Sequence, residues 1–87
     1  MLALTRHSGE SLIIGDDVKI TVLNIYENQI GLCVNDSQCV FVNQQENTSI
    51  RDGIIVNVVK IDKAHVKLGI EVPAGETINK EDGYKND

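Results

Sequence analysis

The sequence predicts an all-β protein, and two observations support this fold class. The chain of 87 residues contains no Trp, one Phe and two Tyr, so its core must come from Val, Ile and Leu, whose β-branched majority favours strands. Residues 18–34 (VKITVLNIYENQIGLCV) also match residues 54–70 (IIVNVVKIDKAHVKLGI) in pattern, 36 positions apart. A domain of this size buries only about 60% of its unfolded surface. Two copies of a short β-unit in one chain therefore predict a shared core.

The repeated stretches place apolar residues at matching positions, as two strands that bury the same face in the same register require. We interpret this pattern as a degenerate internal duplication. The matching pairs are Val18/Ile54, Ile20/Val56, Val22/Val58, Leu23/Val59, Ile25/Ile61, Ile30/Val66, Leu32/Leu68 and Val34/Ile70.

The first half of the chain predicts a series of short strands separated by turn residues. Gly and Asp/Asn clusters end each apolar run, which is typical of antiparallel hairpins. The expected strands are residues 2–6, 11–14, 18–25, 29–34 and 39–43. The last of these is expected to complete a first repeat over residues 1–43.

The second half predicts a partial second repeat over residues 54–82. Residues 44–53 are polar and are compatible with a short helix, a weak strand or a linker. Residues 54–61 and 65–70 then form a hairpin, and residues 76–80 form a short last strand. The polar tail at 83–87 is expected to fray. The whole chain is read as a single domain.

Charge and composition exclude several functional classes. The net charge of −5 argues against broad, charge-driven binding of nucleic acid. No apolar run is long enough to span a bilayer and no signal peptide is recognisable, which predicts a cytoplasmic protein without membrane contact. The sequence has no motif for an activated nucleophile or a phosphate-binding loop, so we expect no enzyme and no cofactor.

The cysteines and histidines lack the spacing of a metal site. Cys33 and Cys39 lie on expected strands without a CxxC motif, and we expect them to be reduced and packed rather than disulfide-bonded. His65 has no Cys or acidic partner at metal-ligand spacing. No metal is therefore expected.

Several short motifs together resemble the carbon storage regulator (CsrA/RsmA) family. Their order and spacing match over residues 1–6 (MLALTR), Gly9-Glu10, Ile14-Gly15-Asp16, Asn28-Gln29 and Val34-Asn35. Residues 40–42 (VFV) resemble the last strand of that family. Residues 66–73 (VKLGIEVP) and 76–82 (ETINKED) resemble its fourth and fifth strands again, so strands three to five occur twice.

The resemblance implies a fold and a function. Family members form a small interleaved antiparallel β-sheet sandwich or barrel, act as homodimers, and bind single-stranded mRNA loops that contain GGA. They regulate translation, often as repressors, and each RNA site combines the first strand of one subunit with the fifth strand of the other. We therefore expect an RNA-binding regulator.

The resemblance assigns candidate RNA contacts to the first strand. Leu4, Thr5, Arg6 and His7 occupy it, and arginine can give a bidentate contact to phosphate or guanine. For Arg6 the competing interpretation is a solvated cation at a strand end, and His7 can equally be an exposed turn residue.

The fifth strand has two candidate copies. In the later copy, Ile78, Asn79 and Lys80 keep one cation, although Lys lacks the planar fork of Arg. In the earlier copy, Val42, Asn43 and Gln44 are weaker candidates because none is charged. We therefore expect one working site per chain. Lys60, Lys63 and Lys67 either extend a phosphate track or form an ordinary solvated face.

Two arrangements and two functions stay open at this point. The second repeat either replaces a partner subunit, with residues 2–6 beside residues 76–80, or adds outer strands to a unit that dimerises as the family does. The alternative function is a degenerate paralogue with weak or no RNA binding. Such a protein would act through protein–protein contacts at its strand edges, including hetero-association with a CsrA-type subunit.

Overall fold

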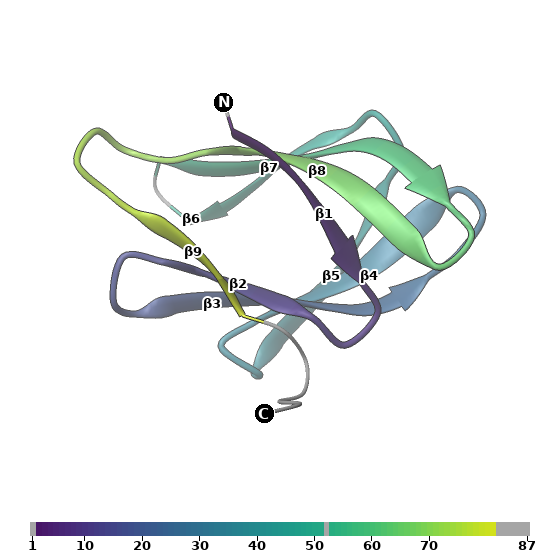
Figure 1. Ribbon diagram of the computed structural model, residues 1–87, viewed down its shortest axis with the longest axis horizontal. Helices are drawn as coiled ribbons and strands as arrows, with labels where there is room; N and C mark the ends of the chain where they lie inside the picture. Colours follow the sequence, from purple (N-terminus) through teal and green to yellow (C-terminus); the bar gives the residue numbers. More distant parts are fainter. Residues whose placement is uncertain (1, 52, 82–87) are drawn as a thin grey trace.

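The computed structural model describes residues 2–51 and 53–81, and these residues form strands and turns without a helix. The all-β prediction is confirmed. Figure 1 shows the strands arranged as two layers. Their bounds are β1 (Leu2–His7), β2 (Ser11–Ile14), β3 (Val18–Ile25), β4 (Gln29–Val34), β5 (Gln38–Asn43), β6 (Asn47–Arg51), β7 (Ile54–Asp62), β8 (His65–Glu71) and β9 (Ile78–Glu81).

The strands form two antiparallel sheets that share one core. One sheet has the order β1-β8-β7-β6 and the other has the order β5-β4-β3-β2-β9. β1, from the first half of the sequence, therefore pairs with β8 from the second half. β9, from the second half, pairs with β2 from the first half. Within the described residues no helix has the length and hydropathy needed to cross a membrane.

The core contains the apolar residues that the two repeated stretches share. Ile20, Val22, Leu32, Val56 and Leu68 are each fully buried, because alternate residues of a strand face the same side. Matching positions therefore face the interior in both halves. The remaining buried members of the core are Leu4, Leu12, Ile14, Val18, Ile30, Val34, Val42, Ile54, Val58, Val66 and Ile70.

One expected core pair lies on the surface instead. Leu23 and Val59 are 42% and 36% exposed. The register of β3 against β4 shifts between Val22 and Asn24, and that of β7 against β8 shifts between Val58 and Lys60. Alternation from the buried Val22 and Val58 already turns Leu23 and Val59 outward. The β-bulge at each place leaves the following residue exposed as well and returns Ile25 and Ile61 to the core side.

The same hydrogen-bonding arrangement occurs twice, 36 residues apart. β1 pairs with β8 from Leu2↔Ile70 to His7↔His65, and β5 pairs with β4 from Gln38↔Val34 to Asn43↔Gln29. The following turns also correspond. The N–H of Gly9 donates to the carbonyl of Val22, and the N–H of Gln45 donates to the carbonyl of Val58.

This register equates β5 with β1 and β6 with β2. The undecided segment at residues 44–53 thus contains a strand, β6, and the turn before it copies the turn between β1 and β2. Gln45 adopts a φ of 65° where Gly9 has 89°. The limits of the two repeats, residues 43 and 54, stay a prediction. In the structure, the part of the chain that repeats the arrangement of β1 begins at Gln38.

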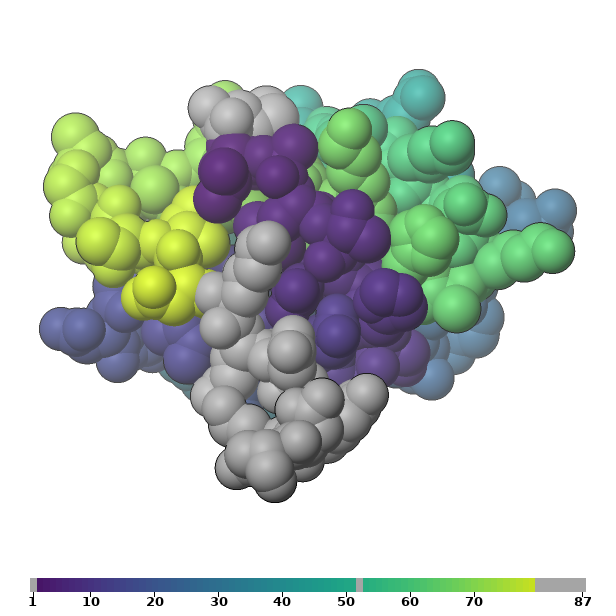
Figure 2. Space-filling model, in the orientation of Figure 1, coloured from purple at the N-terminus to yellow at the C-terminus, as the bar shows by residue number. Residues whose placement is uncertain are grey.

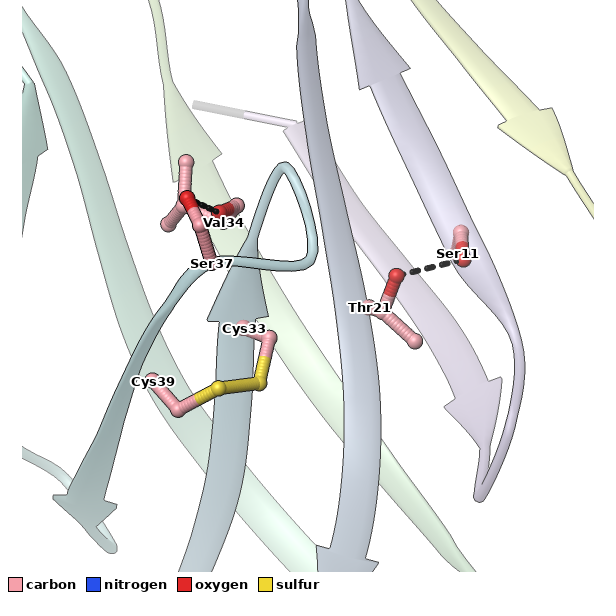
Figure 3. Close-up of a disulfide and its surroundings, with 6 residues drawn as sticks. All are labelled: Ser11, Thr21, Cys33, Val34, Ser37 and Cys39. Carbon is pink, nitrogen blue, oxygen red and sulfur yellow. Dashed lines mark hydrogen bonds between the residues drawn. A yellow bond between two sulfur atoms is a disulfide. The ribbon is translucent and has the colours of Figure 1, made fainter.

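The expectation of reduced cysteines is wrong for this structure. Cys33 and Cys39 are directly opposite each other in β4 and β5, with 4.0 Å between their Cα atoms, and form a disulfide (Figure 3). The loop that it closes spans six positions, so the chain-entropy model assigns it only about 2 kcal/mol. The disulfide reinforces a hairpin that is already held by the β4–β5 pairing.

Candidate nucleic-acid surface

The first and last strands lie at the edges of different sheets and border the same surface. Each of β1 and β9 pairs with one strand, β8 and β2 respectively. β1 and β9 are not hydrogen-bonded to each other, but Leu2 and Ile78 line a common open hollow of about 380 Å³. Figure 2 shows β1 (purple) and the start of β9 (yellow) on one face of the molecule. The two strand edges thus flank one surface.

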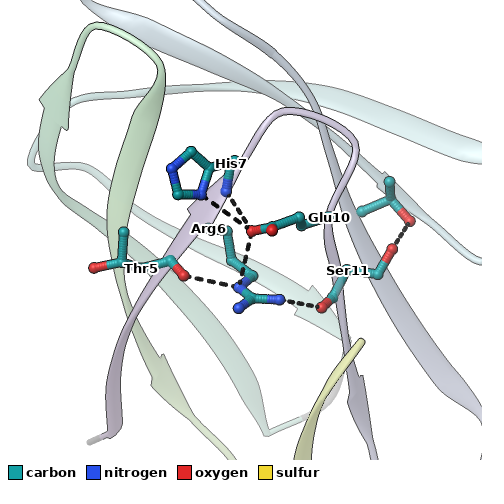
Figure 4. Close-up of polar contacts among 6 residues, drawn as sticks. Thr5, Arg6, His7, Glu10 and Ser11 are labelled. Atoms are coloured by element: carbon teal, nitrogen blue, oxygen red, sulfur yellow. Dashed lines mark hydrogen bonds and ion pairs between the residues drawn. The ribbon is translucent and has the colours of Figure 1, made fainter. Parts of the chain in front are cut away.

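The side chain of Arg6 is buried against the turn between β1 and β2. Its exposed fraction is 6%. Its Nε donates to the carbonyl of Thr5 at 2.8 Å, and its Nη1 donates to the carbonyl of Ser11 at 3.1 Å (Figure 4). Nε also lies 3.7 Å from Oε1 of Glu10. Arg6 therefore fixes the shape of this turn.

Glu10 organises the same turn from the other side. Its Oε1 accepts a hydrogen bond from the backbone N–H of His7 at 2.7 Å. This bond lowers the pKa of Glu10, the Arg6 guanidinium lowers it further, and desolvation opposes both effects only in part. The ionised carboxylate is therefore favoured in the folded protein.

This lowered pKa predicts a pH-dependent contribution of Glu10 to stability. A depressed carboxyl pKa adds stability above the unfolded value of about 4.3, and that stability is lost as the pH falls through the folded pKa. Glu10→Gln is expected to lower the free energy of unfolding at pH 6, with a smaller difference from the parent at pH 3. Urea titrations across this range measure it.

Glu46 provides a matched control for that experiment. Its Oε1 accepts from the backbone N–H of Asn43 at 3.1 Å, and Val42 replaces the buried arginine. Glu46→Gln is expected to cost less at pH 6 than Glu10→Gln. Equal losses for the two variants at every pH would contradict the role of the Arg6–Glu10 contact.

The outer face of β1, β8 and β7 carries cations beside Thr5. Thr5 is exposed and pairs with Lys67, and Lys67 pairs in turn with Lys60 on β7. His7 and His65 are cross-strand partners with ring centroids 5.4 Å apart. Like charges directly opposite each other are unfavourable in a sheet, and a bound anion would relieve that repulsion.

The corresponding face of the other sheet lacks these cations. At the positions that match Thr5, Lys67 and Lys60, it carries Phe41, Gly31 and Asn24. Phe41 is 64% exposed, and its ring centroid lies 6.2 Å from that of Tyr26. At these three positions, cations therefore occur only in the half that contains β1.

The structure brings only part of the expected first-strand contacts to the surface. Thr5 and His7 are exposed, whereas Leu4 is 6% exposed and faces the core. The side chains of Leu4 and Arg6 therefore point away from solvent, and a contact from these two residues would come from the backbone at the free edge of β1. Their role in RNA binding remains a prediction.

The two candidate fifth strands have different positions. In β9, Ile78 is half-buried against the core and Asn79 is exposed, while the side chain of Lys80 lies outside the described part of the structure. In the earlier candidate, Val42 is buried and Asn43 and Gln44 are exposed. β5 lies beside β4 at the opposite end of the sheet that contains β9. Only β9 therefore borders the surface next to β1.

Lys67 is the neighbour of Thr5 that the sequence alone did not single out. It was one of three lysines assigned to either a phosphate track or a solvated face. The pairing of β1 with β8 places Lys67, and not Lys60 or Lys63, directly opposite Thr5. The resemblance of residues 66–73 to a fourth strand is the sequence feature that could have indicated this pairing. Among residues 2–51 and 53–81, no cluster of three or more His, Cys, Asp or Glu side chains could hold a metal ion.

Comparisons with known proteins fit this geometry. No solved structure matched the chain. The family model described as CsrA, a global regulator protein family, matches residues 1–46. This match covers more than half of the 87 residues and includes β1 to β5 and the Arg6–Glu10 turn. The chain therefore belongs to the CsrA family of global regulators.

Proposed function

We propose that this protein regulates translation by binding GGA-containing loops of mRNA at the surface between β1 and β9. The family is one of regulatory RNA-binding proteins. Sequence-specific RNA recognition targets unpaired bases, which exposed strand edges can contact through backbone groups while cations hold phosphates. The protein has no catalytic role in this proposal and acts in the cytoplasm, where mRNA is translated.

The observation that carries the proposal is that β1 has both an open edge next to β9 and a row of cations on the outer face of its sheet. The edges of β1 and β9 share a hollow, and Lys60 and Lys67 lie in adjoining positions next to Thr5. In a chain with a net charge of −5, such a local group of cations favours one specific anionic ligand over general binding to polyanions.

We further propose one RNA site per chain. The face that corresponds to Thr5, Lys60 and Lys67 carries no cation at those positions in the other half, and the described residues provide no second copy of β9 beside β5. An RNA with two GGA loops is therefore expected to bind two chains, one at each loop.

An electrophoretic mobility shift with a GGA hairpin tests this function. The hairpin and a version with the triplet mutated are compared at the same stated salt concentration, because phosphate contacts make affinity depend on salt. We expect binding that depends on the triplet. Equal affinity for the two hairpins, or no binding to either, would contradict the proposal.

Two substitutions locate the site in the same assay. Lys80→Ala is expected to weaken binding by about 1–3 kcal/mol, because it removes a cation from β9. Gln44→Ala, directly after the earlier candidate strand β5, is the control and is expected to change little. If Gln44→Ala were the more damaging change, the RNA would bind elsewhere.

A further inference from the structure

The outer edge of β6 differs from the corresponding edge in the other half of the molecule. β6 corresponds to β2 at the 36-residue spacing, and β2 is covered by β9 from Ile14↔Ile78 to Ser11↔Glu81. β6 ends its sheet, and within residues 2–51 and 53–81 no strand pairs with its outer edge. The edge of β2 is thus covered by a strand, whereas the equivalent edge of β6 is open.

An apolar pocket accompanies the open edge. Its volume is about 130 Å³, comparable to a cavity of about 150 Å³ that accepts a small apolar molecule. Ile50 is half-buried and Val40 is 42% exposed, so this wall of the core is incompletely covered. The pocket is lined by Val34, Gln38, Val40, Thr48, Ser49 and Ile50.

The filled half shows what kind of residue covers such a place. There Ile78 lines a hollow together with Leu2 and Ile70, which are the counterparts of Gln38 and Val34. Ile78 comes from β9 and packs against the core. The open pocket therefore matches a place that an aliphatic residue of an added strand occupies in the other half.

Charge defines a second feature of the missing strand. The carboxylate of Glu76 lies directly against Gly15, the residue that follows β2. By sequence spacing Gly15 matches Arg51, an exposed cation at the end of β6, where a register shift after Ser49 pairs it with Ile54. A strand added along β6 would bring an acidic residue, two positions before its aliphatic residue, to the end of β6 that carries Arg51.

We propose that the β6 edge binds an extended segment of another protein by β-strand addition. The segment runs antiparallel to β6, places an aliphatic side chain in the pocket and has an acidic residue two positions earlier. Backbone hydrogen bonds supply affinity and the pocket supplies selectivity. Among residues 2–51 and 53–81, every strand other than β6 itself already has its place in one of the two sheets, and β9 pairs with β2. We therefore assign the segment to a different polypeptide. This site is separate from the RNA surface between β1 and β9.

A synthetic peptide with the sequence of residues 73–81 (PAGETINKE) is the probe. It is titrated into the full-length ¹⁵N-labelled protein, and amide chemical shifts are followed by NMR. We expect saturable shifts at Thr48, Ser49 and Ile50, with resonances of Ser11 to Ile14 unchanged. A peptide that carries Ile78→Asp is expected to bind at least tenfold more weakly.

Val40→Glu and Val59→Glu form a matched pair in the protein. The two valines are 42% and 36% exposed, but only Val40 lines the pocket. Val40→Glu is expected to weaken peptide binding at least tenfold, and Val59→Glu should leave it unchanged. Retained thermal unfolding transitions show that both variants fold.

Three results of the peptide titration would overturn the proposal. They are no shifts on β6 at millimolar peptide, shifts on β2 that report exchange with the protein's own β9, and equal binding of the two peptides. Shifts on β6 caused by the GGA hairpin would also overturn it, because nucleic acid would then occupy this edge. None of these results depends on whether the surface between β1 and β9 binds RNA.

Discussion

Arg6→Ala is expected to lower the free energy of unfolding by about 3 kcal/mol and to abolish RNA binding as a consequence. The guanidinium is 6% exposed and donates to the carbonyls of Thr5 and Ser11. Its removal leaves buried carbonyl groups without these donors and Glu10 without its nearby cation. Removing one member of a buried ion pair typically costs 3–5 kcal/mol, and the 18% exposure of the Glu10 side chain favours the lower end of this range.

Urea denaturation of Arg6→Ala, with Arg51→Ala as control, measures this effect. Arg51 is exposed, so its replacement is expected to change the free energy of unfolding by less than about 0.5 kcal/mol. RNA binding of Arg6→Ala is then measured at a temperature where the variant is folded. A fully stable variant that has lost RNA binding would show that Arg6 contacts RNA directly and does not act through the turn.

The repeated hairpin was predictable because its sequence pattern survives. Ile20, Leu32, Val56 and Leu68 stand at matching positions of the two copies and are buried as expected. The correspondence of β5 and β6 with β1 and β2 was hidden because individual substitutions erase it. Val42 replaces Arg6 and Gln45 replaces Gly9, so the charge and turn signals are lost while the backbone arrangement remains.

The disulfide could have been predicted from register, although motif spacing did not suggest it. The turn at residues 35–37 joins β4 to β5, and counting outward from Val34↔Gln38 places Cys33 opposite Cys39. CxxC spacing identifies cysteines that are close in sequence, whereas Cys33 and Cys39 are close because they are cross-strand partners in a hairpin. Directly opposite residues in a hairpin have Cβ atoms close enough for a disulfide.

The candidate site was predictable only in part, because strand pairing selects its members. The sequence identified Thr5, Lys67 and Ile78 as separate candidates or elements. The pairing of Thr5 with Lys67 depends on β1 crossing to β8, and the position of Ile78 near Leu2 depends on β9 crossing to β2. The inward orientation of Arg6 also depends on the turn that it stabilises. The resemblance over the first strand could identify Arg6 as a candidate residue. It could not predict that the guanidinium is buried, because that depends on the folded turn.

β9 adds an edge strand to one half of the molecule, and the two proposed binding surfaces differ because of it. On β2 it covers the sheet edge and brings Ile78 to the hollow that Leu2 of β1 also lines. The equivalent edge at β6 lacks such a strand within the described residues. The two halves thus share a backbone arrangement but offer different surfaces, one suited to RNA and the other to an added protein strand.

Ile78→Asp is expected to detach β9 and to reduce RNA affinity at least tenfold, about 1.4 kcal/mol. Ile78 packs against the core, so the variant loses apolar burial and places a carboxylate at an apolar contact, at a cost of about 2–3 kcal/mol. Detachment moves Asn79 and Lys80 away from β1. Mobility shifts with the GGA hairpin and hydrogen exchange of the β2 amides measure the two effects.

Thr77→Asp is the matched control for this change. Thr77 is exposed and immediately precedes β9, so the variant introduces the same charge one position away without removing apolar burial. It is expected to retain β2 protection and most of the RNA affinity. Both variants could instead lose affinity equally while the β2 amides stay protected. That result would show that the added negative charge is the cause, and it would contradict the requirement for an attached β9.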